Sequence, residues 1–249
     1  MTETASDGRV VEIANPRGRA RAVLVCEHAS PYIPPEYKSL GISETGRYAH
    51  AVWDPGAEWL ARAVSDRLDA PLALSRVSRL VHDCNRPAGS TAACPEKVER
   101  IVVPGNRGLT EIDRQARANA VYHPFHQAVA GVLAEKGRSA ALVTVHSFSP
   151  TWHGKARSCE IGLLHDADDS LARAMMAAAS LSDRVELNQP YSAADGVTHT
   201  LARYSDRVQA SVMIEVRNDL LTDQQGVDGV AETITGLLLA AVNQEATLQ

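Results

Sequence analysis

The stretch VLVCEHASPYIPPEY (residues 23–37) passes abruptly from an apolar run to polar residues. Residues 23–26 form a short, unbroken apolar run rich in valine, which is typical of a strand buried on both faces of a sheet. Glu27 and His28 follow at the point where that strand should end. A second stretch, ALVTVHSFSP (141–150), repeats the pattern with His146. Two buried strands therefore each deliver a histidine at their C-terminal end.

Outward from these two runs, strand patterns alternate with helix patterns along the chain. We predict strands at 21–27, 141–146, 159–166 and 211–216, one or two strands within 71–83, and helices at 54–68, 111–137, 170–180 and 230–244. Asp54 and Pro55 suit the N-cap and first turn of the helix at 54–68, and Pro124 should interrupt the helix at 111–137. Strands separated by helices predict an α/β fold with a mixed, largely parallel twisted sheet and helices on both faces. We expect one domain over 1–249, with 1–9 as a flexible tail.

The composition excludes several functional classes. The 249 residues carry a net charge of −5 and no basic run, which argues against a nucleic-acid partner. We find neither an apolar run of about 18 residues nor an apolar segment near the start, so we expect no membrane association and no secretory signal. The four cysteines form no C-x-x-C pair and are expected to be reduced thiols of a cytoplasmic protein. The sequence leaves the oligomeric state open.

Ligands of an open parallel sheet gather at the C-terminal ends of its strands, where His28 and His146 are expected. Two histidines and one carboxylate, with an open fourth position, form a catalytic zinc site. The H-x-x-E spacing is absent because Pro31 stands three residues after His28. We therefore choose Asp54 as the third ligand, with Glu58 as the alternative.

Further polar residues at the same edge suggest hydrolysis. Glu215, near the open position, would take a proton from zinc-bound water and pass it to the leaving nitrogen. Asn85 and Arg86 would bind a substrate carboxylate. Each residue also has a structural interpretation: the histidines as hydrogen-bonded strand-end residues, Asp54 as an N-cap, DCNRP (83–87) as a turn, and Glu215 and Arg217 as a surface ion pair.

Together these segments resemble the N-formylglutamate amidohydrolase family, which is related to the zinc carboxypeptidases. The resemblance lies in CEHASPYIP (26–34), HAVWDPGA (50–57), SRLVHDCNRP (78–87), YHPFH (122–126), VHSFSP (145–150), IGLLHDAD (161–168), NQPYS (188–192) and IEVRNDLL (214–221). It implies a three-layer sandwich like that of the zinc carboxypeptidases, with VHSF supplying the second zinc histidine. It also implies a catalytic role for Glu215, carboxylate binding by Asn85 and Arg86, and a mobile substrate-binding tyrosine at Tyr191.

The resemblance implies a zinc-dependent amidohydrolase of amino acid catabolism that acts on a small N-acyl amino acid such as N-formyl-L-glutamate. An acidic substrate needs a second cation, for which Arg79, Arg114 and Arg157 are candidates. One departure is that better-known members carry Pro-His-Ser-Gly where this chain has Glu27-His28-Ala29-Ser30. The alternatives are a metallo-carboxypeptidase, another N-acyl amino acid amidase, or a non-catalytic binding protein on a decayed hydrolase scaffold.

Overall fold

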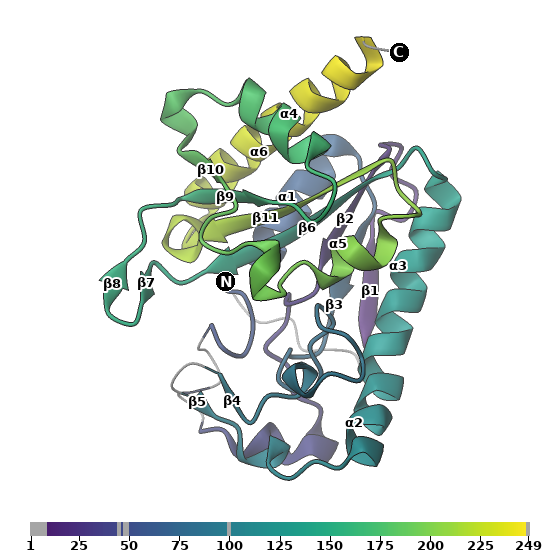
Figure 1. The fold of residues 1–249 in the computed structure, drawn as a ribbon, viewed down its shortest axis with the longest axis vertical. Coiled ribbons are helices and arrows are strands. Elements are labelled where there is room, and N and C mark those ends of the chain that lie inside the picture. Colours follow the sequence, from purple (N-terminus) through teal and green to yellow (C-terminus); the bar gives the residue numbers. More distant parts are fainter. Residues whose placement is uncertain (1–8, 44–45, 47–49, 99–100, 248–249) are drawn as a thin grey trace.

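The fold is built around one seven-stranded sheet, seen in a computed structural model that describes residues 9–43, 46, 50–98 and 101–247 (Figure 1). The strand order is β1-β3-β2-β6-β11-β9-β10. The strands of this sheet are β1 (Val11–Ala14), β2 (Ala22–Cys26), β3 (Leu72–Ser75), β6 (Ala141–Phe148), β9 (Ile161–Leu164), β10 (Val185–Leu187) and β11 (Ala210–Arg217). Two short ribbons, β4 (Lys97–Val98) with β5 (Ile101–Val102) and β7 (Thr151–Trp152) with β8 (Lys155–Ala156), lie outside it.

The centre of the sheet is parallel and its margins are mixed. Strands β3, β2, β6 and β11 run in the same direction. Strand β9 is antiparallel to β11, β10 is parallel to β9, and β1 is antiparallel to β3. The predicted mixed, largely parallel sheet is confirmed. Because β2, β6 and β11 are parallel neighbours, their C-terminal ends meet at one edge.

Helices cover both faces of the sheet and complete a three-layer α/β/α architecture (Figure 1). Helices α1, α4 and α6 pack together on one face, and α3 and α5 contact strands on the other. The α-helices are α1 (Ala57–Leu68), α2 (Glu111–Arg117), α3 (His123–Lys136), α4 (Ser170–Ala178), α5 (His199–Tyr204) and α6 (Gln224–Thr247). Within the described residues, none of the helices combines the length and apolarity needed to cross a membrane.

Strand β2 shows why the central strands read as continuous apolar runs. Leu24 and Cys26 belong to the core under α1, α4 and α6, whereas Val23 and Val25 belong to the core under α3 and α5. All four side chains are 0% exposed. Side chains alternate between the faces of a strand, so a strand with helices on both sides must be apolar at every position.

Several local expectations are corrected. The structure adds β1, β10 and α5, and begins the last helix at Gln224 rather than at 230. Helix α1 begins at Ala57 with Gly56 as its N-cap, so Asp54 is not a cap and Pro55 is not its first residue. Pro124 lies in the first turn of α3, and the irregularity is instead a π-helical segment at Ala118–Tyr122. Most of the expected tail, residues 1–8, lies outside the described residues.

Candidate metal centre and active site

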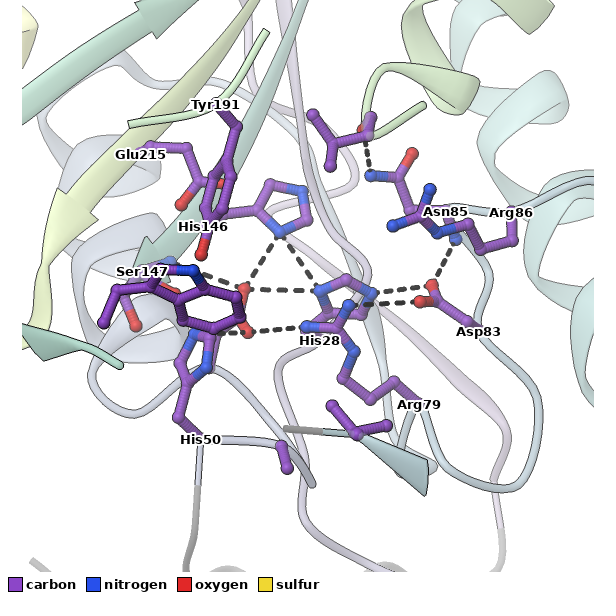
Figure 2. A pocket seen from close by; sticks show the side chains of 15 residues that line it. His28, His50, Arg79, Asp83, Asn85, Arg86, His146, Ser147, Tyr191 and Glu215 are labelled. Atoms are coloured by element: carbon purple, nitrogen blue, oxygen red, sulfur yellow. Dashed lines mark hydrogen bonds and ion pairs between the residues drawn. The ribbon is translucent and has the colours of Figure 1, made fainter. Parts of the chain in front are cut away.

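His28, Asp54 and His146 converge at the carboxyl edge of the sheet (Figure 2). His28 follows β2 and His146 lies in the neighbouring parallel strand β6, which brings the two ring centroids to 4.8 Å. Asp54 arrives on the segment before α1, where its backbone N–H donates to the carbonyl of His28 at 3.0 Å. The three side chains are buried, with 2–3% of each residue exposed.

The three donor atoms form a compact triangle. His146 Nδ1 lies 3.2 Å from His28 Nδ1 and 2.9 Å from Asp54 Oδ2, and the third edge, from His28 Nδ1 to Asp54 Oδ2, is 3.3 Å. Tetrahedral zinc with bonds of about 2.0–2.1 Å separates its ligand atoms by about 3.3 Å. Donor type and spacing therefore fit a divalent zinc ion with little rearrangement.

The second nitrogen of each imidazole faces a carboxylate. His28 Nε2 lies 2.7 Å from Asp83 Oδ1, and His146 Nε2 lies 3.1 Å from Glu27 Oε2. A carboxylate at Nε2 favours the proton on that nitrogen and leaves Nδ1 as the lone-pair donor. Both rings are therefore oriented with Nδ1 towards the centre of the triangle.

The electrostatics of the site keep its acids ionised. Burial opposes ionisation of Asp54 and Asp83, but the neighbouring His28 and Arg79 outweigh it and hold the pKa of both carboxyl groups below the ordinary value. Burial likewise opposes charge on His146, yet Glu27 and Asp54 raise its pKa well above the usual range. Arg79 spans the site, because its guanidinium donates to Asp54 and Asp83 at 3.2 Å each.

Glu215 is the exception among these carboxyl groups. In the β6–β11 register it lies opposite His146, and its side chain lines the same cavity (Figure 2). Burial, reinforced by the charge of Asp54 and only partly offset by His146, raises the pKa of Glu215 to about 7. A carboxyl group with this pKa can both accept and release a proton near neutral pH, as a general base and acid must.

These residues open into a cavity of about 190 Å³. Arg86 lines it and donates to the carbonyl of Gly196 at 2.5 Å. Asn85 also lines it, but its side chain is hydrogen-bonded to Val197 O and to the N–H of Thr200. Asn85 thus links to the segment at 197–200 through both hydrogen bonds, and both Asn85 and Arg86 lie on the cavity wall.

Tyr191 lines the cavity opposite Arg86 and packs against an arginine (Figure 2). The guanidinium of Arg157 lies 4.7 Å from the centroid of the Tyr191 ring and 5.0 Å from that of Trp152. Trp152, on β7, is also part of the cavity wall. Tyr191 and Trp152 line the cavity, and Arg157 packs against both rings without lining it.

Two sequence candidates lie elsewhere. Glu58, the alternative third ligand, forms ion pairs with Arg62 and Arg76 at 2.8 Å each. Arg114 donates to the carbonyl of Leu109 at 2.6 Å and lines a separate surface pocket with Cys94 and Glu96. Neither lines the cavity, and Asp54 completes the triangle. Of the other two second-cation candidates, Arg79 lines the cavity, whereas Arg157 contacts the lining residues Trp152 and Tyr191.

Sequence reasoning did not assign His50, Asp83 or Glu27 a role. His50 lines the cavity, and its Nε2 lies 2.6 Å from Ser147 O and 3.5 Å from Asp54 Oδ1. Its signal was the spacing of His50 and Asp54, four residues apart in HAVWD. The sequence feature that could have indicated Asp83 and Glu27 is their nearness to predicted site residues. Asp83 precedes Asn85 in DCNR, and Glu27 precedes His28 in EH.

A glycine makes room for the loop that bears Tyr191. Gly162 on β9 lies opposite Glu215 in the register. A Cβ at this position would come within 1.7 Å of the carbonyl oxygen of Gln189, two residues before Tyr191. The loop can therefore approach the sheet this closely only because residue 162 has no side chain.

Comparison with known proteins bears on the family of the chain. The chain resembles gene product Atu2144 of Agrobacterium tumefaciens, with 43% identity, a TM-score of 0.91 and 96% of each chain covered. It is also similar in fold to the N-formylglutamate amidohydrolase of Ralstonia eutropha JMP134, at 18% identity and a TM-score of 0.64, with 94% of this chain and 97% of that one covered. No curated protein matches. The family model of N-formylglutamate amidohydrolases matches residues 20–222, and the chain belongs to this family.

Proposed function

We propose that the chain is a zinc-dependent amidohydrolase that cleaves the N-acyl amide of an acidic amino acid, with N-formyl-L-glutamate as the first substrate to test. Water is added across the amide bond, which yields the free amino acid and formate. The observation that carries the proposal is the triangle of His28, Asp54 and His146, with edges of 2.9–3.3 Å, beside a buried carboxyl group of pKa about 7. When bound there, zinc would polarise the acyl oxygen and acidify water.

The chain's own residues supply the proton transfer. Glu215 takes a proton from the attacking water and delivers it to the amide nitrogen, so that the amine leaves in neutral form. Its position across from His146 in the strand register holds the carboxyl group beside the metal ligands. Burial removes water that would otherwise compete for that proton.

The cavity wall supports an acidic substrate. We assign the α-carboxylate of the amino acid to Arg86, with Asn85 holding the adjoining segment and Tyr191 closing the opposite side. We assign the side-chain carboxylate to Arg157, which packs against the cavity-lining Trp152 and Tyr191, because Arg79 is already engaged by Asp54 and Asp83. We propose a cytoplasmic location for the reaction, which the four buried free cysteines support.

The deciding experiment combines metal analysis with an activity panel. We expect about one zinc per chain, and hydrolysis of N-formyl and N-acetyl amino acids with a preference for glutamate or aspartate. His146→Ala should lose the metal, whereas Glu215→Gln should keep it and lose at least about 100-fold in kcat. A folded His146→Ala protein with full activity would refute the proposal. Metal-free wild type without activity on the panel would favour a non-catalytic binding protein.

A matched pair of arginine variants tests the substrate assignment. Arg157→Met should raise the KM for N-formyl-glutamate while leaving that for N-formyl-leucine nearly unchanged. Arg114→Met removes the same charge outside the cavity and should change neither value. An equal loss on both substrates in Arg157→Met would assign this arginine to support of Trp152 and Tyr191 rather than to carboxylate recognition.

A further inference from the structure

Glu27 is a carboxylate in a place where charge is unfavourable. Its side chain is 0% exposed, directly after β2. Neither of its oxygens has a hydrogen bond of acceptable geometry within the described part of the chain. A buried carboxylate is destabilising unless a nearby group compensates for its charge. We therefore expect a neighbouring group whose positive charge or polar N–H compensates for the charge of Glu27.

That partner is His146. In the parallel register β2 pairs Val25 with Thr144, so continuation by two residues brings Glu27 opposite His146. The closest atoms, Glu27 Oε2 and His146 Nε2, are 3.1 Å apart. On the other side of His146, β11 places Glu215 in the same row. His146 thus lies between two carboxyl groups on neighbouring strands, one at its Nε2 and the other facing the cavity.

The partner of His28 provides a comparison. Asp83 contacts His28 Nε2, but it also accepts the N–H of Asn85 at 2.8 Å and the guanidinium of Arg79 at 3.2 Å. Its charge is shared among three groups. For Glu27, the described residues show one ion pair, the one with His146. Replacement of Glu27 should therefore act on His146, whereas replacement of Asp83 would also disturb Asn85 and Arg79.

We propose that Glu27 is a positioning residue of the metal centre: its carboxylate keeps the His146 proton on Nε2, so that Nδ1 presents its lone pair to the ion. The inference rests on the proposed function, because it assumes that His146 binds a metal. A glutamine at 27 would fill the same space without this selectivity. Its amide can donate as well as accept, and donation to Nε2 would move the ring proton to Nδ1 and block the ligand.

The test compares zinc affinity in wild type, Glu27→Gln and a control, Glu58→Gln, by competition with a chromophoric chelator. We expect Glu27→Gln to bind zinc roughly 10- to 100-fold more weakly than wild type. The control removes a carboxylate from an ion pair outside the cavity, and its affinity should stay within about twofold of wild type. The melting temperature of each metal-free protein shows whether the fold is kept, because a purely structural role would lower that temperature and leave zinc affinity unchanged.

A second measurement does not depend on the variant's folding. Long-range ¹H–¹⁵N spectra of zinc-loaded wild type should place the His146 proton on Nε2, and a proton on Nδ1 would overturn the inference. Equal zinc affinity in wild type and folded Glu27→Gln would also overturn it, while leaving the proposed function intact. Wild type that binds no zinc would instead refute the proposed function, and the inference with it.

Discussion

His126 should make the protein sensitive to mild acid. This residue of α3 is 2% exposed and packs against Tyr122 with ring centroids 4.3 Å apart. Its Nε2 donates to the carbonyl of Cys84 at 2.9 Å, and its Nδ1 lies 3.0 Å from the hydroxyl of Tyr204. Cys84 stands between Asp83 and Asn85, so this neutral imidazole anchors the segment that supports His28.

The loss of stability in acid follows from the change in the pKa of His126 on folding. Burial, together with the charge of Arg203, lowers the pKa of His126 from 6.5 to about 4. The unfolded chain therefore takes up the proton first, so the stabilisation is complete above pH 6.5 and is lost as the pH falls towards 4. A shift of 2.5 units corresponds to about 3 kcal/mol of unfolding free energy, of which about 2 kcal/mol is lost by pH 5.

Urea unfolding of the metal-free protein at pH 7.5 and pH 5.0 tests this value, with chelator present so that metal binding does not contribute. We expect wild type to lose about 2 kcal/mol more than His126→Gln between the two pH values. His153→Asn, at an exposed histidine between β7 and β8, should behave like wild type. The reasoning is wrong if His126→Gln and wild type show the same pH dependence.

Other outcomes follow from the sheet and the metal centre. Gly162→Ala should cost about 1–3 kcal/mol of stability and raise KM, because the new methyl group displaces the segment before Tyr191; Gly131→Ala, where a Cβ meets nothing within 4 Å, should be neutral or stabilising. Calorimetry of both variants measures the change in stability, and steady-state kinetics measures KM. An unchanged KM in Gly162→Ala would contradict the prediction. Zinc at 100 times its Kd should raise the unfolding free energy of the metal-free protein by about 2.7 kcal/mol, whereas His146→Ala should not respond in the same denaturation assay.

The part of the fold predictable from sequence is the part whose residues are constrained on both faces. Strands β2, β6 and β11 were located because burial under two helical layers requires apolar residues at every position. The edge strand β1 was not predicted because its four residues are only half-buried. Strand β10 was not predicted because it has only three residues, of mixed exposure. Such marginal strands depend on pairing with a neighbour, which local sequence does not reveal.

The candidate site divides in a similar way. His28, His146 and Glu215 could be placed together because parallel strands bring their ends to one edge. Asp54 was ambiguous in the sequence because its neighbourhood also fits a helix cap. The start of α1 at Ala57 and the long-range contact of Asp54 with His28 distinguish the two interpretations. The role proposed for Glu27 depends on which strand adjoins β2, a property of the sheet rather than of the residues around position 27.

The row of Glu27, His146 and Glu215 runs from the end of β2 across β6 and β11, adjacent strands whose separation of about 4.8 Å is set by backbone hydrogen bonds. The spacing of the proposed ligand His146 and the proposed base Glu215 is thus independent of the loops and of the β7–β8 ribbon, where Arg86, Tyr191 and Trp152 line the cavity. Substitution or insertion in those loops can change which acyl amino acid fits without moving the reacting groups. A descendant with a different substrate would need new loops and could keep the same sheet.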